Sequence, residues 1–391
     1  MIIILRQAVH PNSPEFQQLE AAASRFPELK LSLHSVKGSL QTLSEVYVFG
    51  PTRQVPTDPF EELPFVQKVI RVSSKYRIIG SHDGQVDSVG FEYRGLTFSQ
   101  ESFHVFAGLC AVDTPQHVGV MLRALQKAGL KTTRMGAYKP RTSPYDFQGH
   151  GRSCLPYVFE LAGKYGIEVI AMEVTHESHL EEIASALREA GNPTGVMVQI
   201  GTRNAQNFEL LKHVGNQTEF PVLFKRGMGI TLEESLNACE YVASNGNRRI
   251  VFCLRGMKTI WAEPHRNFVD FAHVPVLKRQ TRLPVCVDPS HSVGKKLAGT
   301  DGLLDIQHAA AQGVIAGANM ILVDFHPSPE LALCDGPQAL LLEELDPFLE
   351  DMQICREAYL RRCGAAARAS ARSTPERRGD AAPAVGARAA G

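Results

Sequence analysis

The sequence lacks the features that would direct it to a nucleic acid or a membrane. Its 391 residues contain 41 Lys and Arg and 41 Asp and Glu, so the formal net charge is zero. A chain without a net positive field does not attract nucleic acid or an anionic membrane surface over long distances. No apolar run approaches the roughly 20 residues that a membrane-spanning helix needs. We therefore expect no nucleic-acid partner and no membrane partner.

The sequence also predicts neither a secretion signal nor a disulfide framework. The first residues, MIIILRQAVHP, have neither the basic start nor the small-residue cleavage site of a signal peptide. The 8 cysteines form no short-spaced pairs. In a chain of this size, such spacing is typical of a reducing compartment. We expect a cytoplasmic protein with free thiols.

The first 73 residues contain no pattern with evident catalytic chemistry. They predict strands at 2–5, 31–35, 46–49 and 66–72 and helices at 13–23 and 59–63. The order β-α-β-β-α-β is that of a ferredoxin-like sandwich. We interpret residues 1–73 as a regulatory or assembly domain.

Strand-like and helix-like segments alternate from residue 103 to residue 362. The expected strands are 103–107, 132–136, 168–172, 195–200, 222–225, 249–253, 285–288 and 320–324, with helices that include 114–128, 176–190, 231–244 and 301–316. Eight parallel strands in about 250 residues are typical of a (β/α)8 TIM barrel. A doubly wound open sheet is the alternative, but no GxGxxG follows the first of these strands.

Two segments flank the predicted barrel. Residues 74–102 form a linker rich in Gly, Ser and Asp, with a hairpin at 90–98 that we expect to close the barrel floor. Residues 363–391 are rich in Ala, Arg and Gly, and this low complexity predicts a disordered tail.

A basic stretch, RMGAYKPRTS at 134–143, follows the second barrel strand. Pro140 fixes its own φ and drives Lys139 toward an extended conformation. Lys139 and Arg141 then stand on a stiff backbone beside hydroxyl groups, an arrangement that suits recognition of phosphate or carboxylate. A solvated basic turn is the alternative when the stretch is considered alone.

Polar or ligating residues follow every expected barrel strand. A barrel enzyme builds its site from residues at the C-terminal ends of its strands. In chain order these residues are Cys110, then Arg134 with Lys139 and Arg141, Glu173, Gln199 with Arg203, Lys225, Arg255, Asp288 with His291, and Asp324 with His326 and Asp335. Their convergence on one mouth favours an active site over ordinary solvation of strand ends.

These residues divide into two chemistries. The cations Arg134, Lys139, Arg141, Arg203, Lys225 and Arg255 predict a mouth with few acids that binds substrates carrying several negative charges. Glu173 is expected to balance and orient one lysine. Cys110, His291, Asp324 and Asp335 suit a divalent transition ion such as Zn²⁺, Mn²⁺ or Fe²⁺. For Cys110 alone a buried apolar role is the alternative, and for His326 we prefer a role in supporting the metal ligands or a structural role.

Several long motifs resemble one enzyme family. They are GAYKPRTSPYDFQGHG (136–151), QIGTRNAQNF (199–208), PVLFKRGM (221–228), LRGMKT (254–259), RNFVDFAHVPVLK (266–278), LPVCVDPSHS (283–292) and DFHPSPELALCDGPQAL (324–340). The chain resembles, over about residues 1–350, the type I-beta 3-deoxy-D-arabino-heptulosonate 7-phosphate (DAHP) synthases, which carry an N-terminal ferredoxin-like domain. Octulosonate-phosphate synthases share the barrel but typically carry Lys-Ala-Asn-Arg where this chain has Lys-Pro-Arg-Thr at 139–142.

The resemblance implies condensation of phosphoenolpyruvate with erythrose 4-phosphate, the first step of the shikimate pathway, at a divalent metal ion (Mn²⁺, Fe²⁺, Zn²⁺ or Co²⁺). It assigns phosphoenolpyruvate to Arg134, Lys139, Arg203, Lys225 and Arg255, erythrose 4-phosphate to Arg141 and Thr142, and the metal to Cys110, His291, Asp324 and Asp335. Lys139, Glu173 and His291 would be catalytic. We expect Lys139 to donate a proton to the forming alkoxide, with a pKa lowered by the neighbouring cations.

The chain departs from the family pattern close to these residues. The family's Gly-Pro-Cys-Ser-Val-Glu is here Gly-Leu-Cys-Ala-Val-Asp at 108–113, and the usual metal-binding Glu is Asp324. Leu254, Lys258 and Thr202 also replace the family's residues. These changes predict an altered metal preference, an altered aldehyde substrate or weaker activity.

Three alternatives to a DAHP synthase, including one of a secondary pathway, remain at this point. They are a synthase for another phosphorylated aldose, a non-catalytic paralogue that binds phosphoenolpyruvate, and a lyase that forms a Schiff base on Lys139 or Lys225. The resemblance also implies an aromatic amino acid as effector and a homotetramer or homodimer. We hypothesise that residues 1–73 pair between subunits and close over the barrel mouth when the effector binds.

Overall fold

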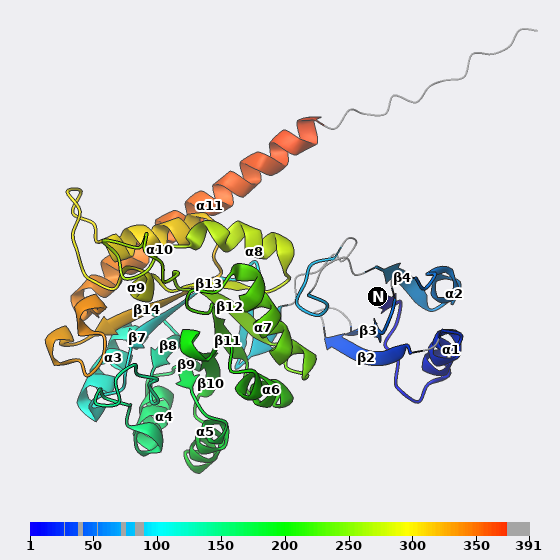
Figure 1. Cartoon of the computed structure of the whole chain (residues 1–391). Coiled ribbons are helices and arrows are strands. Elements are labelled where there is room, and N and C mark those ends of the chain that lie inside the picture. The colour runs from blue at the N-terminus through cyan, green and yellow to red at the C-terminus, as the bar shows by residue number, and fades with distance from the viewer. Residues whose placement is uncertain (27, 38–41, 53, 72–75, 83–89, 374–391) are drawn as a thin grey trace, which may run out of the picture.

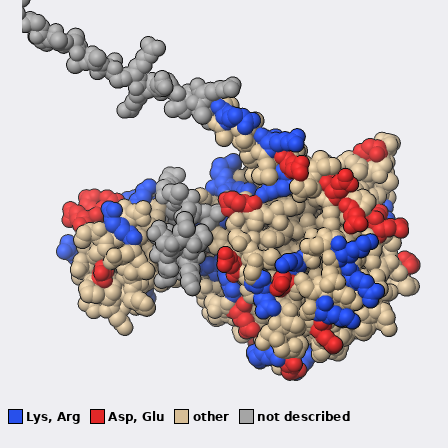
Figure 2. Space-filling model, turned by 180° about the vertical axis from the view of Figure 1, so that it is seen from behind, with Lys and Arg blue, Asp and Glu red and all other residues tan. Residues whose placement is uncertain are grey.

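The computed structural model describes residues 1–26, 28–37, 42–52, 54–71, 76–82 and 90–373. A small N-terminal domain lies beside a barrel, and a long final helix projects from the barrel (Figure 1). Both signs of charge are distributed over the face shown in Figure 2, as the balanced composition predicts. Among the described residues, none of the helices is both long enough and apolar enough to span a membrane.

The N-terminal domain has the predicted ferredoxin-like order. Its elements are β1 (Ile2–Leu5), α1 (Pro14–Ala23), β2 (Lys30–Lys37), β3 (Thr42–Phe49), α2 (Asp58–Glu61) and β4 (Val66–Ile70). The antiparallel sheet has the order β2-β3-β1-β4. Helix α1 begins as its sequence predicts, because the Ser13 side chain accepts a hydrogen bond from the Phe16 N–H and Pro14 occupies the first turn. Residue 72, the expected end of the last strand, lies outside the described residues.

Both faces of this sheet are buried. Side chains alternate along a strand, so Ile3 and Val46 face the domain's own core while Ile2 and Tyr47 join the core cluster of the barrel. The guanidinium of Arg248 lies 4.8 Å from the centre of the Tyr47 ring, and Arg282 Nη1 lies 3.7 Å from Glu45 Oε1. The sheet therefore packs directly on the barrel.

Eight parallel strands form a closed barrel, which confirms the predicted fold and excludes the open doubly wound sheet. They are β7 (His104–Leu109), β8 (Thr132–Met135), β9 (Val169–Val174), β10 (Gly195–Ile200), β11 (Val222–Lys225), β12 (Ile250–Leu254), β13 (Val285–Val287) and β14 (Met320–His326). Strands adjacent in sequence pair in parallel, and β14 pairs with both β13 and β7 to complete the ring. Arg248 and Arg282 precede β12 and β13, so the N-terminal domain contacts the N-terminal ends of the strands.

Helices surround the barrel in alternation with the strands. They are α3 (Pro115–Lys127), α4 (Leu155–Lys164), α5 (Ser178–Glu189), α6 (Phe208–Asn216), α7 (Leu232–Ser244), α8 (Val274–Gln280), α10 (Asp305–Ile315) and α11 (Leu345–Ser373). Local sequence sets several of their starts. In α7 the Thr231 side chain accepts from the Glu234 N–H, and the Glu234 side chain accepts from the Thr231 N–H.

The predicted hairpin closes the floor of the barrel. It consists of β5 (Phe91–Tyr93) and β6 (Leu96–Phe98), which pair antiparallel. Phe98 is 1% exposed and belongs to an apolar cluster with Phe106, Met197 and Leu223 from three barrel strands. This end of the barrel is a packed hydrophobic core.

The predicted boundary of the disordered tail is wrong by several residues. Helix α11 continues past residue 363 to Ser373. The segment after Cys363 is rich in Ala and Arg, which have high helix propensity and extend a helix already anchored on the barrel by Phe348 and Met352. The rest of the predicted tail, 374–391, lies outside the described residues.

Candidate active site

The predicted residues lie at the end of the barrel opposite the hairpin, and most of them are buried. Side chains with at most 8% exposure include Arg134, Lys139, Glu173, Lys225, Arg255 and Asp324. Arg203 and Thr142 are exposed at the rim, where Arg203 Nη2 lies 3.3 Å from Thr142 Oγ1. Burial of so many ionisable groups is not ordinary solvation of strand ends.

Three of these four buried cations are paired with acids. Lys225 Nζ lies 2.6 Å from Asp288 Oδ2, Lys139 Nζ lies 3.9 Å from Glu173 Oε2, and Arg134 forms an ion pair with Asp324. The expectation of a cationic mouth with few acids is therefore wrong. Burying a charge is costly unless an opposite charge faces it, and these acids come from different strands than their partners.

Arg255 differs from these three cations. Its side chain is 2% exposed, and its Nη1 has no hydrogen-bond partner among the described residues. Burial lowers the pKa of this guanidinium below its usual value. Arg134 Nε is a second buried donor without a partner in the described part of the chain. Such donors can be satisfied by an anion that enters the site.

Two glycines allow the charged side chains to approach the backbone closely. Lys139 Nζ donates to the Cys110 carbonyl at 2.7 Å. A Cβ at Gly136 would lie 2.2 Å from that carbonyl oxygen and 3.0 Å from Lys139 Nζ. A Cβ at Gly201 would lie 1.8 Å from Glu173 Oε1. Both positions thus require glycine for Lys139 and Glu173 to occupy the places they have.

The pKa of Lys139 is raised, so the expected lowering by neighbouring cations is wrong. Burial works to lower this pKa, but the Cys110 sulfur and the Glu173 carboxylate oppose it and prevail. Arg134 lowers the pKa of Lys139 only as a smaller contribution. The structure therefore holds Lys139 as an ammonium group.

Cys110, His291 and Asp335 form a compact group of potential metal ligands. Cys110 Sγ lies 3.2 Å from Asp335 Oδ2 and 3.8 Å from His291 Nε2, and His291 Nε2 lies 3.6 Å from Asp335 Oδ2. Ligand atoms of Cys110, His291 and Asp324 also lie within 4.8 Å of one another. A thiol, an imidazole and carboxylates with such separations fit a divalent transition ion.

Asp288 orients His291 toward this group. It caps the short helix α9 (Pro289–Val293), where its Oδ1 accepts from the His291 N–H at 3.0 Å. Asp288 Oδ1 also lies 3.1 Å from His291 Nδ1, which leaves Nε2 directed at Cys110 and Asp335. Burial works to lower the pKa of His291, but Asp288 raises it to about 10. Carboxylates commonly orient metal-binding histidines in this way.

Both carboxylate oxygens of Asp324 already have donors. Oδ1 pairs with Arg134, and Oδ2 accepts from Gln338 Nε2 at 2.6 Å. Arg266 Nη1 holds Gln338 Oε1 and Asp335 Oδ1, each at 3.1 Å. Sequence reasoning missed Gln338 and Arg266, because neither follows directly on a barrel strand.

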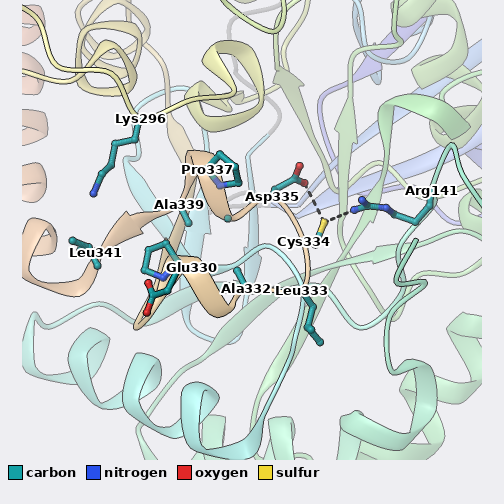
Figure 3. Close-up of a pocket in the computed structure, with 12 residues that line it drawn as sticks. Arg141, Lys296, Glu330, Ala332, Leu333, Cys334, Asp335, Pro337, Ala339 and Leu341 are labelled. Carbon is teal, nitrogen blue, oxygen red and sulfur yellow. Dashed lines mark hydrogen bonds between the residues drawn. The ribbon is translucent and has the colours of Figure 1, made fainter. Parts of the chain in front are cut away.

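Cys334 is another residue that sequence reasoning missed. Its sulfur lies 4.0 Å from Cys110 Sγ. It also lies 3.2 Å from Asp335 Oδ2 and 2.6 Å from Arg141 Nη1, the two contacts drawn in Figure 3. It lines a cavity of about 630 Å³ together with Arg141 and Lys296. Its place next to Asp335 in the sequence was the only signal that could have revealed it.

His326 belongs to a separate hydrogen-bonded group. Its Nε2 lies 2.8 Å from Asp113 Oδ2, which is also 2.6 Å from His117 Nδ1. The Ser328 N–H donates to His326 Nδ1 at 2.9 Å. Burial works to raise the pKa of Asp113, but these histidines lower it to about 2. These contacts place His326 apart from the Cys110 group, and the role expected for it stays a prediction.

The chain is similar to known enzymes over most of its length. Residues 92–360 match the DAHP synthetase I family. The phospho-2-dehydro-3-deoxyheptonate aldolase of Thermotoga maritima is 35% identical over 358 residues, covering 92% of this chain and 98% of that protein. The 2-dehydro-3-deoxyphosphooctonate aldolase of Syntrophobacter fumaroxidans is 27% identical over 286 residues, covering 69% of this chain and 94% of its own length.

Solved structures agree with this relationship. The crystal structure of the Thermotoga maritima DAHP synthase superposes with a TM-score of 0.65 at 32% identity, covering 91% of this chain and 97% of that one. A truncated form of the same enzyme superposes with a TM-score of 0.62, covering 72% of this chain and 97% of its own. The fold, the buried ionic site and these similarities together show that the chain belongs to the DAHP synthetase I family.

Proposed function

We propose that this chain condenses phosphoenolpyruvate with erythrose 4-phosphate to give DAHP and inorganic phosphate. The observation that carries this proposal is Arg255, a buried guanidinium with an unpartnered nitrogen at the same barrel end as the Cys110, His291 and Asp335 group. An anion site beside a potential metal site suits a reaction between two phosphorylated substrates. The name of the Thermotoga maritima relative supports the same activity.

Arg134, Lys139, Arg203, Lys225 and Arg255 would bind phosphoenolpyruvate. Arg255 and Arg134 have buried nitrogens available for its oxygens. Lys225 and Lys139 lie beside Asp288 and Glu173 and add positive potential without leaving their pairs. Holding two anions together in a water-poor site removes a large part of the entropic and electrostatic barrier to their reaction.

Arg141 and Thr142 would bind the phosphate of erythrose 4-phosphate. Arg141 is half-buried and Thr142 is exposed, so both stand at the entrance rather than in the depth of the site. Arg203, which contacts Thr142, connects this entrance to the phosphoenolpyruvate side. A phosphate held here would direct the aldehyde end of a short sugar toward Lys139.

Cys110, His291 and Asp335 would hold a divalent ion, with Asp324 as the fourth residue within reach. When bound, such an ion supplies Lewis-acid polarisation of the aldehyde oxygen. The residues fit transition ions, and Mn²⁺, Fe²⁺, Zn²⁺ and Co²⁺ are the candidates. His291 contributes through Nε2 because Asp288 occupies its Nδ1 side.

Lys139 would transfer a proton to the aldehyde oxygen as C3 of phosphoenolpyruvate bonds to the aldehyde carbon. Its raised pKa keeps this proton in place until negative charge develops on the substrate oxygen. Glu173 would hold the ammonium group of Lys139 in position and favour its reprotonation after the transfer. Water then adds to C2, and the C–O bond to phosphate breaks to release inorganic phosphate.

Phosphate release tests this proposal. We expect the full chain to release phosphate from phosphoenolpyruvate when erythrose 4-phosphate and a divalent ion are both present. Arabinose 5-phosphate is the comparison aldehyde, because relatives named 2-dehydro-3-deoxyphosphooctonate aldolases are also similar to the chain. Absence of turnover with erythrose 4-phosphate and each of the four ions would refute the proposed activity and favour a non-catalytic phosphoenolpyruvate-binding protein.

An aromatic amino acid acting through residues 1–73 would regulate the enzyme in a homodimer or homotetramer. Within one chain this domain contacts the barrel end opposite the active site, so closure over a mouth would need a neighbouring subunit. Deleting residues 1–73 should leave phosphate release intact and abolish feedback inhibition. Unchanged inhibition would refute this assignment.

All 8 cysteines are free thiols, which supports a cytoplasmic location.

A further inference from the structure

We propose that Cys334 is a further ligand of the metal ion, so that the centre has two sulfur ligands. This inference rests on the proposed metal-dependent function, but it concerns the composition of the binding site. Two observations suggest it: the Cys334 sulfur lies 4.0 Å from Cys110 Sγ, and Cys334 directly precedes Asp335 in the chain. Ligand atoms of Cys110, Cys334 and Asp335 lie within 4.8 Å of one another.

The separations of the donor atoms fit one small ion. Zinc binds cysteine sulfur at about 2.3 Å, so two sulfurs on a tetrahedral ion lie roughly 3.8 Å apart. The two sulfurs here are 4.0 Å apart. Asp335 Oδ2 lies 3.2 Å from each of them. His291 Nε2 completes the set at 3.8 Å from Cys110 Sγ and 3.6 Å from Asp335 Oδ2.

The hydrogen bonds of Asp324 leave a coordination position of the metal ion open to another ligand. Its two oxygens are held by Arg134 and by Gln338. Binding an ion through either oxygen would compete with one of these donors. The sulfur of Cys334 instead accepts from the half-buried side chain of Arg141, which lies at the wall of the cavity. The second sulfur therefore compensates for a carboxylate that is committed elsewhere.

Cations balance the negative charge of this ligand set. Arg141 Nη1 lies 2.6 Å from Cys334 Sγ, Lys139 Nζ lies 3.4 Å from Cys110 Sγ, and Arg266 Nη1 lies 3.1 Å from Asp335 Oδ1. Each anionic donor thus has its own positive partner. A pair of thiolates beside a carboxylate would otherwise be strongly disfavoured at a partly buried site.

The second sulfur has a chemical consequence for metal choice. Soft thiolate ligands favour zinc and cobalt over manganese, which prefers oxygen. Cys334 also joins the metal centre to Arg141 at the wall of the cavity. A ligand change at Cys334 would therefore alter metal preference and the position of Arg141 together.

X-ray absorption at the zinc edge tests the proposal directly. The full chain loaded with one equivalent of Zn²⁺ should show two sulfur neighbours, and Cys334→Ala should show one. Cys355→Ser is the matched control, because Cys355 is a partly buried thiol on α11 and should leave the count at two. A single sulfur in the parent protein would overturn the proposal, even if that protein releases phosphate normally.

Metal affinity gives a second measurement. Competition with a chelator should show that Cys334→Ala binds Zn²⁺ at least about tenfold more weakly than the parent, with a smaller loss for Mn²⁺. Equal zinc affinities would contradict the proposal. Alkylation of the parent protein with and without Zn²⁺, read by mass spectrometry, avoids dependence on the variant's folding. Protection of both Cys110 and Cys334 is expected, and protection of Cys110 alone would also overturn the proposal.

Discussion

The two ends of the barrel are built from the same eight strands but bury opposite kinds of side chain. At the floor, Phe98 and Phe106 pack in an apolar cluster. At the other end, Arg134, Lys225 and Asp324 are equally inaccessible to water. Apolar burial stabilises the fold, whereas buried ion pairs contribute little net stability. One end therefore maintains the barrel, and the other is arranged for binding and chemistry.

Removing the metal should have the largest effect, and only at the charged end. Treatment with a chelator should reduce phosphate release to background, because no residue replaces the Lewis acid near Cys110 and His291. Zn²⁺ or Co²⁺ added back in excess should restore it. Full activity in a demonstrably metal-free protein would break the assignment of this end to metal-dependent chemistry.

Lys139→Ala should have the next largest effect. Loss of a proton donor commonly lowers kcat by about 10²–10⁴-fold. Glu173 would also lose its partner, so some loss of stability is expected in addition. The measurement is kcat per folded molecule, with Lys127→Ala on the exposed side of α3 as the control. A kcat close to that of the parent would show that Lys139 only adds positive potential.

Phe98→Ala, at the floor of the barrel, should lower the stability of the fold. Truncating a buried aromatic side chain typically costs about 3–5 kcal/mol of unfolding free energy. Phe208→Ala is the matched control, because Phe208 is 40% exposed. Denaturant unfolding should show the difference, while kcat of the folded fraction stays near that of the parent. A strong fall in kcat would mean that the two ends are coupled.

Asp113→Asn should have the smallest effect, and one that depends on pH. The folded pKa of Asp113 is about 2, below its ordinary value of 3.8. Its contribution, about 2 kcal/mol, is therefore present above pH 4 to 5 and mostly lost at pH 2. The difference in unfolding free energy between parent and variant should shrink over that range. Asp58→Asn, at an exposed position, is the control, and a pH-independent difference would contradict the expectation.

Much of the fold could be predicted because it depends on short-range patterns. Alternation of strands and helices predicted all eight barrel strands, and the hairpin at 90–98 was predicted from the residues between two folded segments. The extent of α11 was missed because low complexity was interpreted as disorder, although Ala and Arg also favour a helix that already has an anchor.

Less of the site could be predicted. The positions of the charged residues at strand ends followed from the sequence, but their partners did not. Lys225 and Asp288 are 63 residues apart, and Arg134 and Asp324 are 190 apart. The expected lowering of the pKa of Lys139 was wrong because it considered only the neighbouring cations and not the partners that distant strands supply.

The sequence by itself determined the kinds of element, their order, the family and the chemical types available at the strand ends. Only the tertiary structure decided which of these groups meet. Cys110 and Cys334 are separated by 224 residues, and they come together because β14 pairs with β7 and closes the ring. Periodicity is a local property of the chain, whereas the neighbours of a buried charge or thiol depend on how distant strands close around it.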